Sequence, residues 1–124
     1  YQEMALRPDA PQPFAPALFV RTSVISANAA GHVTTDAGLK HFATDGPRPR
    51  IARGAPDGAE YHFFGDEHGR IELPDAARHL PVGTALECIT PHCDPTVNLH
   101  DVIVVSRNDV VVDLWPIEAR GAVF

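Results

Sequence analysis

Proline and glycine interrupt this chain at short intervals, and their spacing leaves room only for short elements of secondary structure. The sequence holds 12 Pro and 9 Gly among 124 residues. Proline lacks the amide hydrogen that helix interiors and central strands use, while glycine favours turns. The prolines at positions 8, 11, 13 and 16 therefore predict an extended linker over residues 1–16.

Between these interruptions, alternating polar and apolar residues, many of them β-branched, predict strands. Gly31 and the stretch 65–68 join neighbouring strands into hairpins, and residues 107–109 predict a three-residue hairpin connection. No stretch predicts a helix of more than one turn. We expect a single helical turn at residues 75–79. We expect strands at residues 17–28, 32–36, 50–53, 59–64, 69–73, 85–90, 101–106 and 110–114.

These elements indicate an all-β domain over residues 17–124, an antiparallel barrel or sandwich of short strands. The continuous apolar runs 102–105 and 110–112 predict strands that are buried on both faces. In a small domain, the second face of such strands often packs on a partner domain or another subunit.

Composition argues against several classes of partner. The formal net charge is -6 and no basic cluster is present, so we expect no nucleic acid and no anionic membrane surface as partner. No apolar run approaches the length of a membrane span, and no secretory signal opens the chain. Cys88 and Cys93 are therefore expected to be free thiols in a reducing compartment, the cytoplasm. Since the chain does not begin with Met, we expect it to lie within a longer protein.

The stretch Thr90 to Asp101 carries the residues best suited to chemistry. In an extended backbone, His92 and Asp94 place their side chains on the same face. An imidazole nitrogen and a carboxylate oxygen there can bind one divalent cation and leave positions open for water or substrate. The spacing alone leaves two alternatives open. Asp94 can cap a turn while His92 bonds to backbone, or His92 can join both cysteines in a zinc site.

The remaining candidates have simpler interpretations. His100 is either a neighbour of the motif that supports it or a surface residue at a strand start, and Asp101 is expected to cap or orient the loop. Trp115 is expected to anchor against the core or a partner. Lys40, the only lysine, is expected to be a solvated surface charge. Solvated positions are also expected for the other histidines, which are His32, His41, His62, His68 and His79.

Several motifs together resemble the C-terminal domain of the D-serine dehydratase and D-threonine aldolase family. They are PHCDPTVNL at residues 91–99 followed by Asp101, and WPIEARG at residues 115–121. Residues 33–40 (VTTDAGLK) and the strand 17–26 add to the resemblance, which extends from about residue 14 to residue 121.

The resemblance implies a pyridoxal-phosphate enzyme of the alanine-racemase fold type, in which an N-terminal (β/α)8 barrel holds most of the cofactor. The β-domain completes the active site, commonly in a homodimer, and binds a divalent metal, Mn, Mg or Zn, through a His-x-Asp or His-x-Cys pair. His92 and Asp94 occupy those positions here. The resemblance places no catalytic residue in this chain and assigns it no cofactor-binding residue.

The carboxylate at position 94 favours a hard cation and, by resemblance, an aldolase that cleaves a β-hydroxy-D-amino acid of the threonine or hydroxyaspartate type to glycine and an aldehyde. A D-serine or hydroxyaspartate dehydratase of the same family is the first alternative. A stand-alone all-β binding module, in which His92 and Asp94 are ordinary loop residues, is the second.

Overall fold

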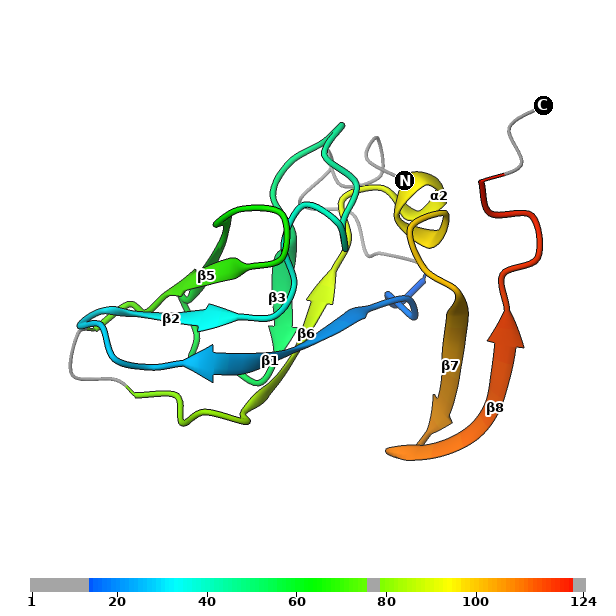
Figure 1. The fold of residues 1–124 in the computed structure, drawn as a ribbon. Coiled ribbons are helices and arrows are strands. Elements are labelled where there is room, and N and C mark those ends of the chain that lie inside the picture. Colours follow the sequence, from blue (N-terminus) through cyan, green and yellow to red (C-terminus); the bar gives the residue numbers. More distant parts are fainter. Residues whose placement is uncertain (1–13, 76–78, 122–124) are drawn as a thin grey trace.

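The computed structural model describes residues 14–75 and 79–121, which form a six-stranded sheet, one short helix and a separate two-stranded hairpin (Figure 1). This confirms the predicted all-β fold class. The predicted linker lies mostly outside the described residues, as does the centre of the turn predicted at 75–79. The elements are β1 Val20–Ser26, β2 His32–Thr35, β3 Arg50–Arg53, β4 Glu60–Phe63, β5 Gly69–Glu72, β6 Ala85–Ile89, α2 Cys93–Val97, β7 Val102–Arg107 and β8 Val110–Pro116.

The six-stranded sheet runs in the order β3-β6-β1-β2-β5-β4, and all of its pairs are antiparallel. Its two outermost strands, β3 and β4, contact each other, so the sheet curls toward a barrel. Strand β1 has one face toward the inside of the curled sheet: Val20, Thr22 and Val24 are buried while the residues between them are not, as the alternating sequence predicts. A register shift between Val24 and Ser26 bends the strand as it passes from β6 to β2.

Aromatic side chains fill the inside of the curled sheet. The rings of Phe42 and Tyr61 lie 5.2 Å apart, and Phe63 stands edge-on to Tyr61 at 5.4 Å. Ile71 and Leu86 are fully buried beside them. Phe42 comes from the loop at residues 36–49 rather than from a strand, so the core holds this loop as well as the sheet.

The loop that follows β2 is fastened at several points. Asp36 accepts hydrogen bonds from the Thr22 hydroxyl (2.6 Å) and the Ser23 amide (2.8 Å). The Tyr61 hydroxyl donates to the Ala37 carbonyl oxygen at 2.6 Å. These bonds and the burial of Phe42 fix the path of a segment whose sequence shows only turn formers.

Strands β7 and β8 form a hairpin that stands apart from the rest of the described chain (Figure 1). They contact each other and no other described strand. The expectation that their apolar runs are buried on both faces is wrong for this chain, because β8 is exposed along its length and Val104 is 58% exposed. The connection has two residues rather than three: Asn108 and Asp109 both have positive φ (51° and 62°), and Arg107 pairs with Val110.

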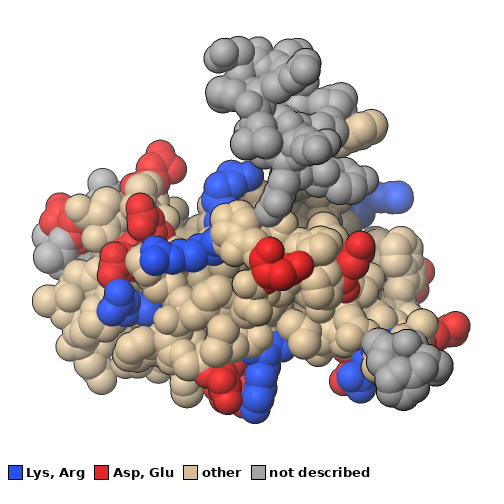
Figure 2. Space-filling model, turned by 90° about the horizontal axis from the view of Figure 1, so that it is seen from above, with Lys and Arg blue, Asp and Glu red and all other residues tan. Residues whose placement is uncertain are grey.

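Residues Cys93–Val97 form helix α2 where the sequence analysis expected an extended loop. Proline at position 95 is compatible with this, since the first turn of a helix does not use its amide hydrogens. None of the helices among the described residues has the length and apolarity to cross a membrane. Seen from above, basic and acidic side chains are interspersed over the surface with broad uncharged areas between them (Figure 2).

Candidate metal centre

His92 sits between the end of β6 and the start of α2, where its backbone is held by two buried threonines. It is the residue before the helix, with extended backbone angles (φ −142°, ψ 122°). Its carbonyl oxygen accepts a hydrogen bond from the Thr96 hydroxyl at 2.7 Å, and the Thr90 hydroxyl lies 3.2 Å away. Thr90 and Thr96 are 6% and 2% exposed and bond to each other. The His92 backbone is therefore anchored, although its side chain is 49% exposed.

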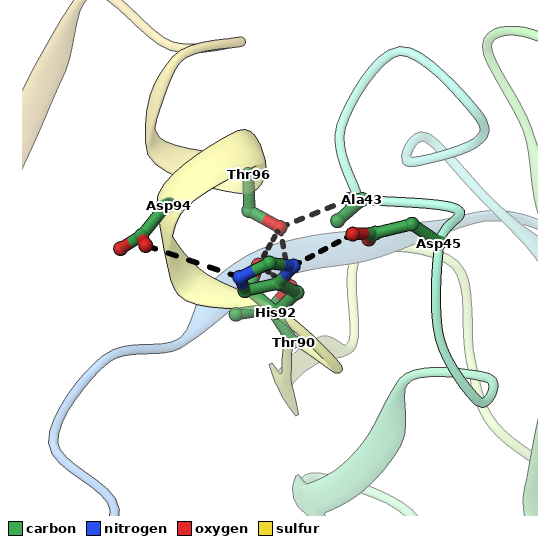
Figure 3. A network of polar contacts seen from close by, with 6 residues as sticks. All are labelled: Ala43, Asp45, Thr90, His92, Asp94 and Thr96. Carbon is green, nitrogen blue, oxygen red and sulfur yellow. Dashed lines mark hydrogen bonds and ion pairs between the residues drawn. The ribbon is translucent and has the colours of Figure 1, made fainter. Parts of the chain in front are cut away.

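The imidazole of His92 lies between two carboxylates that come from different parts of the chain (Figure 3). Nδ1 is 2.7 Å from Oδ2 of Asp45, and Nε2 is 3.9 Å from Oδ2 of Asp94. The first distance is a hydrogen bond and the second is beyond hydrogen-bond reach. The hydrogen bond from His92 lowers the pKa of Asp45 below its ordinary value. Asp94 keeps a free carboxylate that is 94% exposed.

The Asp45–His92 contact depends on the same threonine network. The amide of Ala43, two residues before Asp45, donates to the Thr96 hydroxyl at 2.9 Å. Figure 3 shows this bond joining the loop to the helix beside the imidazole. Thr96 therefore holds both partners of the Asp45–His92 contact at once, one through Ala43 and the other through the His92 carbonyl.

The donor set fits a divalent cation. Ligand atoms stand about 2.0 to 2.2 Å from such an ion, so two neighbouring ligands are separated by roughly 3 Å. Nε2 of His92 and Oδ2 of Asp94 are 3.9 Å apart, and rotation of the exposed Asp94 side chain can close the difference. Among the described residues, the ion pairs of Asp94 and Asp45 involve His92 alone, so no lysine or arginine neutralises them.

The proximity of His92 and Asp94 thus has a different origin from the one predicted. The spacing predicted an extended backbone, in which alternate side chains share a face. In the structure, Asp94 lies in the first turn of α2 and His92 is extended just before it. The turn, rather than the pleat of a strand, brings the two side chains together.

The zinc site of His92 with both cysteines is not formed. Cys88 is fully buried in the core of the sheet, whereas Cys93 is exposed at the start of α2, and both thiols are free. Burial raises the pKa of the Cys88 thiol to about 12, which disfavours the thiolate that a metal requires. Turn-capping by Asp94 remains compatible with its helical position, although the helix shows no side-chain cap from His92.

The residues near the end of the motif support the backbone rather than the centre. The half-buried His100 donates from Nε2 to the His41 carbonyl oxygen at 3.0 Å. Asp101 pairs with Arg120, and its carbonyl oxygen accepts from the Ile117 amide at 2.9 Å, so it joins the start of the hairpin to the segment that follows β8. Trp115 does not anchor against the described core, because it is 53% exposed.

A second group of potential ligands lies on β4 and β5. Among the described residues, only Glu60, His62 and Glu72 bring three such side chains within 4.8 Å of one another. Arg70 already pairs with Glu72 at 2.5 Å, and Arg48 lies 3.5 Å from Nε2 of His62. Two of the three side chains thus already contact a guanidinium group, and we interpret the group as an ion-pair network.

The predicted solvation of the other histidines holds only in part. His68 and His79 are exposed, but the side chain of His62 is only 17% exposed. His32 and His41 are half-buried, and Nδ1 of His41 accepts from the Gly38 amide at 3.1 Å.

Sequence reasoning missed Asp45 and Thr96. Asp45 precedes Gly46 and Pro47, a combination that signals only a turn, and its partner is 47 residues away. Thr96 gives no signal of its own, because a buried hydroxyl network is visible only in three dimensions. An open groove lies beside the Asp45–His92 contact and is lined by Leu39, Phe42, Ala43, Thr44, Asp45, Pro95 and Leu99.

Comparisons with known proteins give consistent results. A family described as "Putative serine dehydratase domain" matches residues 17–106. D-threonine aldolase from Arthrobacter sp is 42% identical over 113 residues, which are 91% of this chain and 29% of that enzyme. 3-Hydroxy-D-aspartate aldolase from Paracoccus denitrificans is 40% identical over 105 residues, 85% of this chain and 26% of that protein.

The fold also agrees with the solved structure of a D-threonine aldolase. The crystal structure of D-threonine aldolase from Filomicrobium marinum superimposes with a TM-score of 0.81 at 32% identity, and covers 91% of this chain and 30% of that one. The chain therefore spans less than a third of the length of each of these three aldolases.

Proposed function

The chain belongs to the serine dehydratase domain family, as the resemblance of its motifs predicted, and on that premise we propose that it is the metal-binding β-domain of a pyridoxal-phosphate aldolase. The substrate would be a β-hydroxy-D-amino acid of the threonine or hydroxyaspartate type, cleaved to glycine and an aldehyde. The observation that carries the proposal is the position of the unneutralised Asp94 carboxylate, 3.9 Å from Nε2 of His92. The two aldolases that resemble the chain support the same reaction class.

His92 and Asp94 would hold the cation in this proposal, and their chemistry limits its identity. An imidazole and a carboxylate suit Mn²⁺ or Mg²⁺, with Zn²⁺ as a third option, whereas a thiolate at position 94 would favour zinc. When bound, the cation polarises the substrate hydroxyl, and pyridoxal phosphate, held mainly by the rest of the enzyme, provides an electron sink. The chain itself anchors the two ligands, through the buried threonines at His92 and through the helix at Asp94.

The exposed hairpin supports a partner domain in the same polypeptide. A two-stranded hairpin is marginally stable in water by itself, yet the hairpin of β7 and β8 presents apolar side chains on both faces, because the consecutive residues Leu114 and Trp115 point to opposite faces and are 59% and 53% exposed. Because the chain spans less than a third of the length of these two aldolases, we propose that an N-terminal (β/α)8 barrel, which the family resemblance implies, covers this hairpin in the full enzyme. Residues 1–16 would be the linker from that barrel, residues 17–124 the β-domain, and the full enzyme a homodimer.

Hydrogen exchange tests this arrangement. In the full enzyme, amides of residues 102–116 that face outward should exchange much more slowly than in the 124-residue chain. Equal exchange in both would show that no domain covers the hairpin. Two unpaired cysteines further support a reducing location, for which we propose the cytoplasm.

The reaction is tested by incubating the full-length enzyme with D-threonine, D-β-hydroxyaspartate and D-serine, with and without a chelator. We expect glycine and an aldehyde from one of the first two, loss of activity with the chelator, and recovery with Mn²⁺ or Mg²⁺. His92→Ala and Asp94→Ala should abolish both activity and metal content. Full activity and unchanged metal content in both variants would remove the proposed centre.

The description of the matched family favours a dehydratase as the second candidate. A D-serine or hydroxyaspartate dehydratase would release ammonia and an oxo acid from the same substrates. The same incubation therefore separates the two reactions. Asp94→Cys should shift the metal preference toward zinc, and an unchanged preference would show that Asp94 is not a ligand.

A further inference from the structure

We propose that Asp45 is a positioning residue that holds His92 in a single tautomer and orientation, with the proton on Nδ1 and the free electron pair of Nε2 turned toward Asp94. The tautomer follows from the contact itself. The connection to metal binding rests on the proposed function, in which Nε2 is a ligand.

The two sides of the ring make different contacts. An ionised carboxylate can only accept hydrogen bonds, so the 2.7 Å contact between Asp45 Oδ2 and Nδ1 requires a proton on Nδ1. A neutral imidazole has one N–H, and Nε2 is then an acceptor without a proton. The 3.9 Å separation of Nε2 from Asp94 Oδ2 is too long for a competing hydrogen bond. With the opposite tautomer, an electron pair on Nδ1 would face the carboxylate of Asp45.

Asp45 is held in place by a segment that the core and α2 both fix. Phe42 is 1% exposed, and the Ala43 amide donates to the Thr96 hydroxyl at 2.9 Å. Since Thr96 also donates to the His92 carbonyl oxygen, the loop and the histidine share one anchor. Figure 3 shows the carboxylate of Asp45 reaching the ring from the side opposite Asp94.

Such a carboxylate behind a histidine is an effective device for a metal site. The second nitrogen of a metal-binding imidazole usually donates to a carboxylate or a carbonyl, which fixes the ring and makes the ligating nitrogen more basic. The described contacts give Nδ1 of His92 no other acceptor, so the side chain of Asp45 carries this task alone. Its loss should leave the fold intact, because the Asp45 side chain is 55% exposed.

The test measures the His92 tautomer in the metal-free protein by long-range ¹H–¹⁵N correlation spectra near neutral pH. We compare the wild type with Asp45→Asn, Asp45→Ala and the control Asp57→Ala, which removes an equal charge from another exposed loop. The wild type and the control should show Nδ1 protonated. Both Asp45 variants should show a mixture or the opposite tautomer with unchanged circular dichroism. An unaltered tautomer in both Asp45 variants would overturn the proposal.

A separate titration with Mn²⁺ connects the tautomer to metal binding. Loss of the carboxylate behind a ligating histidine typically weakens metal affinity by about 10- to 100-fold, and we expect a loss of that size in both Asp45 variants and none in Asp57→Ala. Equal Mn²⁺ affinity in all four proteins would overturn the metal-positioning role. If the wild type takes up no Mn²⁺ but its tautomer still depends on Asp45, the proposed metal function fails while the positioning of His92 by Asp45 is upheld.

Discussion

Replacing Thr96 with valine tests whether the buried hydroxyl network joins the loop to the candidate centre. Valine has nearly the same shape, so the change removes hydrogen bonds without opening a large cavity. The Ala43 amide, in a residue that is 4% exposed, loses its acceptor, and an unsatisfied buried amide costs about 1 to 3 kcal/mol. The bond to the His92 carbonyl oxygen is lost as well, which adds about 1 kcal/mol. The free energy of unfolding should fall by about 2 to 4 kcal/mol.

Urea denaturation followed by far-ultraviolet circular dichroism measures this change, provided that the slope against denaturant is unaltered. The matched control is Thr96→Ser, which keeps the hydroxyl and loses one methyl group, at a cost of roughly 1 kcal/mol. We therefore expect valine to be clearly worse than serine. If Thr96→Val unfolds within about 0.5 kcal/mol of the wild type, the hydroxyl does not join the two segments and the reasoning is refuted.

Four further predictions concern the sheet, its loop and the two cysteines. Gly38→Ala should lower the free energy of unfolding by more than about 2 kcal/mol in urea denaturation, because a Cβ there would stand 2.4 Å from a backbone carbonyl oxygen; a neutral effect would contradict that packing. Tyr61→Phe leaves the buried Ala37 carbonyl without its donor and should cost about 1 to 3 kcal/mol by the same method, whereas an unchanged midpoint would show that the bond contributes nothing. Burial raises the pKa of the Cys88 thiol to about 12 from 9.0. The protonated thiol therefore contributes its full stabilisation below pH 9.0, and this stabilisation is lost as the pH rises toward 12. The free energy of unfolding should thus fall less steeply at alkaline pH in Cys88→Ala than in the wild type. A thiol reagent at neutral pH should modify Cys93 at once and Cys88 only after unfolding; rapid modification of both would contradict the burial.

The strands were predictable because their signals are local. Residues 50–53 were expected as a strand, and β3 is Arg50–Arg53; the alternation in β1 likewise corresponds to its buried residues. The short helix α2 was missed because a five-residue element gives too little periodicity to detect, and its proline suggested a loop. The length of the β7–β8 turn was missed because Asn108 and Asp109 adopt positive φ without a glycine.

The candidate site likewise contains residues that the sequence identifies and one that only the structure reveals. His92 and Asp94 are neighbours in the sequence, so their identity, their chemistry and the family they indicate can be read without a structure. Asp45 cannot be found by that route, because its contact with His92 joins residues 47 positions apart. That contact exists only because the core buries Phe42 and Thr96 bonds to Ala43.

From the amino-acid sequence alone follow the all-β class, the order of the strands along the chain and one adjacent pair of ligand-type side chains. The curling of the sheet, the exposure of the β7–β8 hairpin and the side of His92 that remains free were decided by the tertiary structure. The physical reason is one of range. Strand propensity and turn chemistry act over a few residues, whereas burial and hydrogen bonding across the fold determine which distant groups meet.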